Sequence, residues 1–331
     1  MAAVPFFIYL APLVVSFVLQ PLASLCNVNL RCFISFVRLR DFYLYVYCLY
    51  CGLTPCSVDL DNQTTVHFWA PQHRRFHKPA LVLIHGFGGN SRWQWEHQLK
   101  SLSDAFNVFV PDLVFFGCSV SKSSERSVLF QARSVGEGLK RLGVRKYSVV
   151  GLSYGGYVAF RMAEMYEEQI EKVVIMSSGI CWSEEEKEEM LRKGGRDVAE
   201  ILVPERAEDL RILMTRSIYR SPAWKQWIPA FVLQDFIQVM YKDHRKERKE
   251  MLKELLLKQP KSYKLPTLNQ ETLIIWGDKD DVFPLYLGHK LQRHLGEKSR
   301  IEVIRDAGHA VQMDDSRRVN HLIKSFVPTS G

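Results

Sequence analysis

The sequence predicts an α/β fold, in which a mostly parallel central sheet is flanked by helices and carries a helical insertion late in the chain. Three observations support this prediction. Short, continuous apolar runs recur along the chain, at residues 81–84, 108–110, 147–150, 173–176, 272–276 and 301–304. Such runs are typical of strands buried on both faces of a parallel sheet. Turns rich in glycine or polar residues follow these runs, and the segment between the fourth and fifth runs has a helical character.

Length and composition indicate a globular domain with a large core. The chain has 331 residues, of which 47% are hydrophobic and 24% charged, and α/β folds commonly reach about 250 residues undivided. The net charge of +8 favours an anionic membrane surface or acidic ligands. No nucleic-acid-binding motif accompanies this charge, so a nucleic-acid partner is not expected and a solvated basic surface is the preferred interpretation.

The N-terminal segment, residues 1–55, resembles a membrane anchor. Residues 1–30 contain no charged side chain and are long enough to span a bilayer, although three prolines would bend a helix. A cleaved signal peptide is the alternative, but the first basic residues, Arg31, Arg38 and Arg40, follow the apolar run instead of preceding it. We therefore expect membrane association with the remaining domain on the cytoplasmic side, the endoplasmic reticulum being one candidate membrane.

A second apolar run, residues 42–53, is too short to span and is dense in tyrosine. It suits either the headgroup zone of a membrane or a hydrophobic flank of the domain. Five of the seven cysteines lie in residues 26–56. Their odd total predicts buried or membrane-facing thiols and no disulfide framework. The sequon at Asn62 tests on which side of the membrane the domain lies, because glycosylation of this residue in cells would contradict the predicted cytoplasmic location.

The early part of the remaining domain shows no metal site. His73 and His77 lie four residues apart, and His67 precedes them. The segment 71–79 that holds the first two is bracketed by prolines and crowded with cations, which is typical of an exposed connection between strands. We therefore predict that no metal binds here.

A glycine-rich turn and a candidate nucleophile follow two of the buried runs. The run 81–84 leads into His-Gly-Phe-Gly-Gly at 85–89, whose backbone N–H groups could bind an oxyanion. The run 147–150 leads into Gly-Leu-Ser-Tyr-Gly, which contains Ser153. Between a strand and a helix such a turn forces the serine into a strained conformation and exposes its hydroxyl.

The helical insertion extends over about residues 180–264. Ser183 and the three glutamates after it suit a helix start. The charged stretch 242–253 is interpreted as a solvated helix face with pairs such as Lys246 and Glu250. Apolar residues of the insertion that precede this stretch could form an acyl-binding wall or pack within the insertion. They are Trp224, Trp227, Ile228, Phe231, Val232 and Phe236.

The last two buried runs lead into candidate acid and base residues. Three aspartates, Asp278, Asp280 and Asp281, follow the run 272–276, and His309 follows the run 301–304. The chain order is therefore serine, aspartate, histidine. This order is the one found in α/β-hydrolases, and it differs from the orders of chymotrypsin and subtilisin.

Over about residues 56–331, these motifs resemble the α/β-hydrolase superfamily, and they look like its branch of monoacylglycerol lipases and uncharacterised plant relatives. The resemblance implies a nucleophile at Ser153, a general base at His309, and an oxyanion hole at the backbone N–H groups of Phe87 and Tyr154. It also implies that the insertion at 180–264 is a cap covering the active site.

The family pattern Gly-x-x-Asp-x-x-x-Pro places Asp280 in the position that orients the histidine, since Gly277 and Pro284 bracket it. Asp278 and Asp281 are then turn residues that cap backbone N–H groups or face water.

These residues predict a serine hydrolase that cleaves a carboxylic ester, lipid-like or apolar, through an acyl-enzyme and without a cofactor. A serine at position 153 argues against relatives that attack epoxides or haloalkanes, which use an aspartate there. Two alternatives remain open: a hydrophobic small-molecule receptor that retains the triad, and a carbon–carbon lyase similar to hydroxynitrile lyases. The sequence does not identify the acyl or alcohol group.

Overall fold

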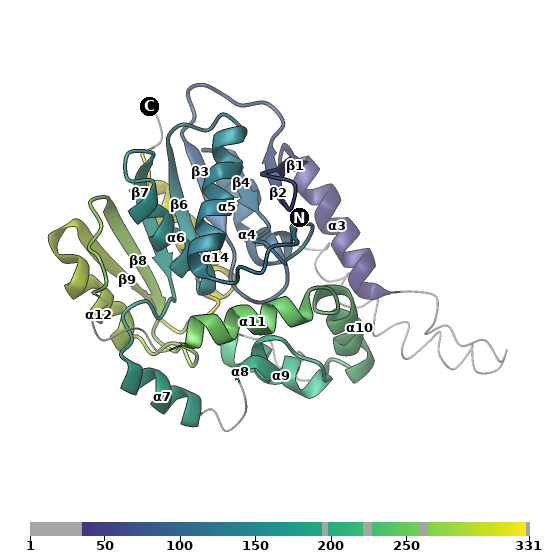
Figure 1. Ribbon diagram of the computed structural model, residues 1–331. Coiled ribbons are helices and arrows are strands. Elements are labelled where there is room, and N and C mark those ends of the chain that lie inside the picture. The colour runs from purple at the N-terminus through teal and green to yellow at the C-terminus, as the bar shows by residue number, and fades with distance from the viewer. Residues whose placement is uncertain (1–34, 194–197, 221–226, 258–263, 329–331) are drawn as a thin grey trace.

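The computed structural model describes residues 35–193, 198–220, 227–257 and 264–328 (Figure 1). A central sheet has the strand order β1-β2-β4-β3-β6-β7-β8-β9, with β5 paired to β2. Its strands are β1 Leu53–Asp59, β2 Thr64–Pro71, β3 Ala80–Ile84, β4 Asn107–Pro111, β5 Val120–Ser121, β6 Tyr147–Leu152, β7 Ile170–Met176, β8 Glu271–Gly277 and β9 Ser299–Ile304. From β4 to β9 all neighbours are parallel, whereas β1 and β2 pair antiparallel.

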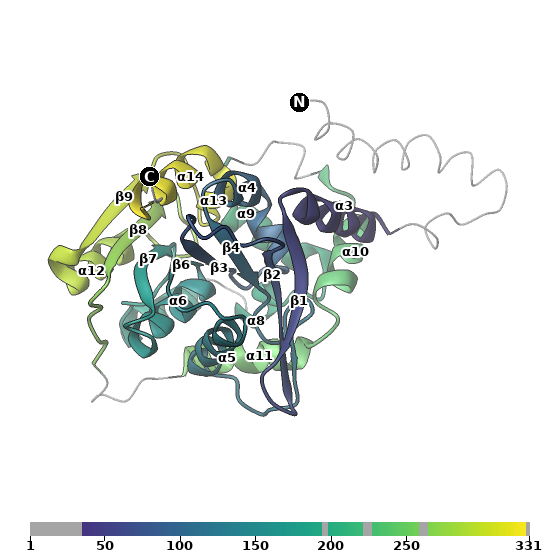
Figure 2. The same ribbon diagram turned by 90° about the horizontal axis from the view of Figure 1, so that it is seen from above.

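Helices cover both faces of this sheet (Figure 2). Outside the insertion they are α3 Phe36–Tyr50, α4 Ser91–Ser103, α5 Val128–Arg141, α6 Tyr154–Met165, α12 Tyr286–Leu295, the 3-10 turn η4 Gly296–Lys298, α13 Val311–Asp314 and α14 Ser316–Phe326. The predicted fold class is confirmed, and each of the six predicted apolar runs lies within a strand.

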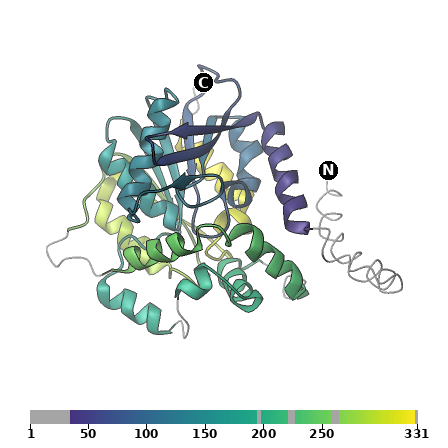
Figure 3. The same cartoon turned by 45° about the vertical axis from the view of Figure 1, so that its right-hand side comes forward.

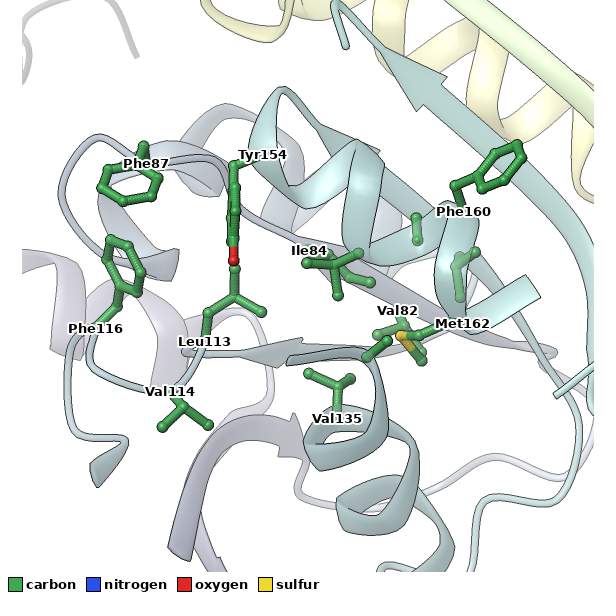
Figure 4. Close-up of a cluster of buried hydrophobic side chains, with 14 of the residues drawn as sticks. Val82, Ile84, Phe87, Leu113, Val114, Phe116, Val135, Tyr154, Phe160 and Met162 are labelled. Atoms are coloured by element: carbon green, nitrogen blue, oxygen red, sulfur yellow. The ribbon is translucent and has the colours of Figure 1, made fainter. Parts of the chain in front are cut away.

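The alternation of side chains along β3 explains why this strand is apolar at every position. Val82 and Ile84 belong to a core shared with α5 and α6, whereas Leu81 and Leu83 belong to a second core shared with α4 and α14. Successive strand residues point to opposite faces, so inner strands such as β4 and β6, which are covered on both faces, are buried at every position. Figure 4 shows the first core, where Val82 lies near side chains of both helices.

The insertion between β7 and β8 is helical where the structure describes it. Its helices are α7 Glu184–Lys193, α8 Val198–Leu202, α9 Ala207–Ser217, α10 Ala230–Met240 and α11 Arg245–Leu256. Ser183 begins the first of them with a reciprocal cap: its hydroxyl accepts from the N–H of Glu186, and its own N–H donates to that carboxylate. Together these helices lie along one end of the sheet (Figure 1).

Helix α3, which lies within the predicted N-terminal segment 1–55, packs against the rest of the described domain. It contacts α4, α10 and β1, and β1 crosses residue 55, where the sequence placed the end of the N-terminal segment. Among the described residues, no helix has both the length and the apolar character needed to cross a membrane. The span predicted at residues 1–30 lies outside the described residues.

Candidate active site

Ser153 lies on a strained turn between β6 and α6. Its backbone φ is +54° and its ψ is −117°, a region that side-chain-bearing residues occupy only when the surroundings enforce it. The surroundings do so here: its N–H donates to Met176 O at 2.8 Å, and Ser178 Oγ donates to its carbonyl at 2.8 Å. A Cβ at Gly155 would lie 2.3 Å from Ile84 O, so this close approach requires glycine.

His309 and Asp280 complete a hydrogen-bonded chain that starts at this serine. His309 Nε2 lies 2.9 Å from Ser153 Oγ, and His309 Nδ1 lies 3.0 Å from Asp280 Oδ2. Both Asp280 and His309 are buried, while Ser153 is half-buried. The second carboxylate oxygen of Asp280 accepts from the N–H groups of Val282 and Phe283, each at 2.8 Å. These two bonds hold the carboxylate toward the imidazole.

The other two aspartates of this turn lie elsewhere. The carboxylate of Asp278 contacts Lys279 Nζ at 3.1 Å and accepts from the Ala307 N–H. Asp281 is exposed. Of the three carboxylates, the structure thus places Asp280 on the histidine, which is the position that the Gly-x-x-Asp-x-x-x-Pro pattern predicted.

The two amides predicted to form an oxyanion hole lie at adjoining turns. A Cβ at Gly86 would lie 3.1 Å from the Ser153 Cβ, so the glycine-rich turn approaches the serine closely. The rings of Phe87 and Tyr154 meet edge to face with centroids 5.2 Å apart (Figure 4). Among the hydrogen bonds of the described residues, neither backbone N–H of these two has an acceptor. An oxyanion hole requires donors of this kind, and the assignment of these two amides to it stays a prediction.

Gln94, which the sequence did not single out, holds the glycine-rich turn in shape. Its Oε1 accepts from the Gly86 N–H at 2.8 Å, and its Nε2 donates to the carbonyls of Gly86, at 3.0 Å, and Gly88. One side chain thereby satisfies three polar groups of the turn. The available signal was a polar residue within the first turns of a helix that directly follows the glycine-rich segment.

His85 supports the same turn from inside the core. Its Nδ1 lies 2.7 Å from Gly86 O, and its Nε2 accepts from the Leu113 N–H at 2.9 Å. This pair of partners requires the neutral tautomer that carries its proton on Nδ1. Burial lowers the pKa of His85, which keeps the ring neutral as these bonds demand.

The helical insertion reaches the site from two sides. A Cβ at Gly88 would lie 3.7 Å from the Tyr241 hydroxyl, and one at Gly89 would lie 3.9 Å from the Phe236 ring. On the other side, the Ala310 N–H donates to Ser217 O at 2.7 Å. The insertion therefore touches both the glycine-rich turn and the loop that carries the histidine, as a cap over the site would.

Asp314 joins the cap to the histidine loop. One of its carboxylate oxygens accepts from the N–H of Gly308 at 2.8 Å and from that of Tyr219 at 3.0 Å, and the other accepts from the N–H of Arg220 at 2.8 Å. The guanidinium of Arg220 in turn donates to the carbonyls of Arg305 and Asp306. A single carboxylate therefore positions the residue before His309 relative to the cap.

Asp314→Ala is expected to lower kcat by about tenfold with a smaller change in KM, because three hydrogen bonds to a charged acceptor are lost and the His309 loop shifts. Steady-state kinetics on a nitrophenyl ester would measure this. Asp61→Ala is the matched control: Asp61 accepts from the N–H groups of Gln63 and Thr64 in the turn between β1 and β2, so its loss should lower thermal stability and leave kcat nearly unchanged. Equal kcat values for the two variants would contradict the role of Asp314.

The histidines considered as metal ligands separate in the structure. His73 and His77 are exposed, whereas His67 is buried on β2 beside Asp112. His67, Asp112 and Cys118 bring ligand atoms within 4.8 Å of one another. The Asp112 carboxylate, however, already accepts from the N–H groups of Ser91 and Cys118, which indicates a structural role. The prediction that no metal takes part stays a prediction.

Three comparisons relate this chain to known proteins. Residues 79–316 match the protein-family model described as the alpha/beta hydrolase fold. A 2-hydroxy-6-oxononadienedioate/2-hydroxy-6-oxononatrienedioate hydrolase from a Pseudomonas species is 26% identical over 269 residues, which cover 75% of this chain and 87% of that protein.

Two solved structures share the fold. One is a membrane phospholipase A described as a bacterial virulence factor, with a TM-score of 0.74 and 23% identity over 93% of this chain and 96% of that chain. The other is a 2-hydroxy-6-oxo-6-phenylhexa-2,4-dienoate hydrolase from Rhodococcus sp. strain RHA1, with a TM-score of 0.68 and 20% identity over 82% of this chain and 98% of that chain. The narrower resemblance to monoacylglycerol lipases and plant relatives stays a prediction.

Proposed function

Since the chain belongs to the alpha/beta hydrolase fold family, we propose that it is a serine hydrolase that cleaves a carboxylic ester with a lipid-like or apolar acyl group. One observation carries the proposal: Ser153 Oγ, His309 and Asp280 form a hydrogen-bonded chain with contacts of 2.9 and 3.0 Å, beside two backbone N–H groups with no acceptor among the described residues. A nucleophile, a base, an orienting acid and oxyanion donors are the parts that acyl transfer requires.

The proposed reaction begins with proton transfer. His309 Nε2 accepts the Ser153 hydroxyl proton as Oγ attacks the acyl carbonyl carbon. The Nδ1–H of the same ring donates to Asp280, which fixes the tautomer and stabilises the positive charge that develops on the imidazole. Because two hydrogen bonds already hold the turn at Ser153 in its strained conformation, the hydroxyl needs little rearrangement before attack.

The carbonyl oxygen becomes an oxyanion in this step. The N–H groups of Phe87 and Tyr154 would donate to it, and loss of one such donor typically costs about 3 to 4 kcal/mol of barrier height. His309 then protonates the leaving alcohol, which leaves an acyl-enzyme on Ser153. A water molecule, deprotonated by the same imidazole, attacks the acyl group and releases the acid.

Aromatic side chains around the site support an apolar acyl group. The Phe283 ring packs against the His309 ring with centroids 5.5 Å apart, and Trp182 packs on Phe283 at 5.2 Å. Of the residues predicted as an acyl-binding wall, Phe236 reaches the glycine-rich turn, whereas Trp227 is 80% exposed and Trp224 lies outside the described residues.

Multiple turnover of nitrophenyl esters is the expected result for the wild-type protein, with kcat/KM rising from acetate to longer acyl chains as more apolar surface is buried. Release of nitrophenol measures the rate. A single slow burst with retained product would favour a receptor that keeps the triad. Activity confined to cyanohydrins would favour a lyase.

A second candidate function follows from the Pseudomonas relative, a 2-hydroxy-6-oxononadienedioate/2-hydroxy-6-oxononatrienedioate hydrolase. The same serine, histidine and aspartate could then cleave a carbon–carbon bond beside a ketone. Incubation with 2-hydroxy-6-oxo-6-phenylhexa-2,4-dienoate distinguishes the two, because this substrate is chromophoric and its cleavage removes the colour. Faster turnover of this compound than of any ester would replace the first proposal.

We also propose that the N-terminal segment associates the protein with a membrane and that the hydrolase domain faces the cytoplasm. The charge-free residues 1–30 and the basic residues that follow them support this orientation. Asn62 is exposed in the turn between β1 and β2, so an enzyme in a glycosylating compartment could modify it. Glycosylation of Asn62 in cells would overturn the cytoplasmic orientation.

A further inference from the structure

Helix α3 has two apolar faces, and only one of them packs against the domain. Its buried side chains are Val37, Leu44 and Cys48. Its exposed apolar side chains, with their exposed fractions, are Leu39 at 58%, Phe42 at 64%, Val46 at 46%, Leu49 at 41% and Tyr50 at 66%. Apart from Arg38, every exposed residue of this helix is therefore apolar or aromatic.

The five exposed residues form one stripe along the helix, because their spacing of three, four, three and one positions follows a period of 3.6 residues. We call them the outer stripe. A surface helix of a water-exposed domain normally presents polar residues on this side. A contiguous exposed apolar stripe indicates an interaction site.

The outer stripe is a fixed part of the surface, since α3 is bound firmly to its neighbours. Asp41 accepts from Arg92 at 2.7 Å and from the Trp93 indole N–H at 2.9 Å. At its N-terminal end, the Val37 N–H and the Ser35 hydroxyl both donate to Asp235 of the cap helix α10. Figure 3 shows α3 on the outer flank of the molecule, next to the cap.

We infer that the outer stripe docks onto the interface of a lipid bilayer. The 30 charge-free N-terminal residues precede α3 in the chain and are separated from it by five residues, of which Arg31 is charged. Phenylalanine, tyrosine and leucine on one face with arginine at the margin are typical of a helix that lies in the plane of the interface. Arg38 borders the stripe and is exposed, as a contact to anionic headgroups requires.

A second copy of the chain fits the stripe less well. A helix of fifteen residues is about 22 Å long, and a stripe about 10 Å wide along it covers only a few hundred Å². Stable protein interfaces bury roughly 800 Å² on each partner. The lipid surface has no such requirement, because the preceding segment would contribute to the same attachment.

Docking through the outer stripe would also orient the cap. Helix α10 contacts α3 and carries Phe236, which reaches the glycine-rich turn. A bilayer in contact with α3 would therefore lie close to the cap. The benefit of this position for a lipid-like substrate rests on the proposed function, whereas the docking of the outer stripe does not depend on hydrolysis.

Photochemical cross-linking on the full chain tests the docking without any turnover. A diazirine-bearing residue replaces Phe42, and the protein is reconstituted into phosphatidylcholine vesicles that contain a minority of phosphatidylserine. The matched control places the same residue at Val303, which is 40% exposed on β9 at the opposite edge of the sheet. Mass spectrometry should show lipid adducts at position 42 in about tenfold excess over position 303. Cross-links to residues 1–34 or to a second copy, or equal lipid labelling at both positions, would overturn the inference.

Activity supplies a second measurement that separates this inference from the proposed function. Phe42→Glu combined with Val46→Glu should lower hydrolysis of a long-chain ester embedded in these vesicles by about tenfold, because two apolar contacts become charges. Hydrolysis of a soluble short-chain ester should stay within about twofold, which also shows that the variant is folded. Unchanged hydrolysis of the embedded ester would contradict the docking. Absence of all ester turnover in the wild type would contradict the proposed function and leave the cross-linking result intact.

Discussion

Replacement of Ser153 by alanine is expected to abolish ester turnover, with a fall in kcat of about 10⁴-fold or more. The substitution removes the one oxygen within 2.9 Å of His309 Nε2 that can become acylated. The proposed oxyanion donors are backbone groups that this substitution leaves unchanged, so a small residual rate above that in water is expected. Nitrophenol release measures the loss of turnover in the variant. Mass spectrometry should detect an acyl adduct on the wild-type serine.

Ser148→Ala is the matched control for that experiment. Ser148 is a buried serine on the same strand, β6, so its loss removes a hydroxyl from the same element without touching the site. Its kcat should stay within about twofold of the wild-type value. Turnover that survives Ser153→Ala at more than a few per cent would show that the reaction does not use this serine.

Asp280→Asn is expected to lower kcat by about 10⁴-fold while the protein stays folded. An asparagine can still accept from the N–H groups of Val282 and Phe283, as the aspartate does at 2.8 Å. Its amide NH₂, however, would face His309 Nδ1 and favour the tautomer with a proton on Nε2. That tautomer cannot accept the proton of Ser153, so the general base is lost.

The neighbouring aspartates provide the controls. Asp281→Asn should change kcat by less than about twofold, because Asp281 is exposed. Asp278→Asn should have a modest effect through its bond to the Ala307 N–H. Kinetics on the three variants, with thermal unfolding as a check on folding, would decide the assignment. Equal losses at all three positions would contradict it.

The positions of the buried strands were predictable because their signal is local. A strand buried on both faces favours apolar residues at consecutive positions, and the runs at 81–84 and 173–176 show this preference directly. The turn at Ser153 was equally predictable, since its two glycines allow contacts that any side chain would block. The structure places Ser153, His309 and Asp280 together, as the order of the motifs led us to expect.

The residues around this trio were not predictable in the same way. Gln94 and Asp314 each hold a loop of the site through three or more hydrogen bonds, yet neither belongs to a motif. Asp314 acts on Tyr219 and Arg220, about 95 residues away in the chain. Such partners become neighbours only after the cap has folded over the sheet.

The N-terminal region likewise has one feature that the sequence predicted and another that only the folded structure shows. The sequence identified residues 42–53 as apolar and tyrosine-rich, and it allowed either a headgroup location or a flank of the domain. In the structure, residues 36–50 form α3, with one face packed on the domain and the other exposed. The sequence does not distinguish an apolar residue on the covered face of this helix from one on the exposed face. The packing of α4, α10 and β1 decides which face is covered.

The sequence by itself determined the fold class, the strand-turn-helix setting of Ser153 and the chain order of the three reactive residue types. These depend on local backbone requirements, which neighbouring residues satisfy. Only the tertiary structure decided how the cap is joined to the histidine loop and which face of α3 remains exposed. Those outcomes depend on distances between segments far apart in the chain, and such distances exist only once the chain is folded.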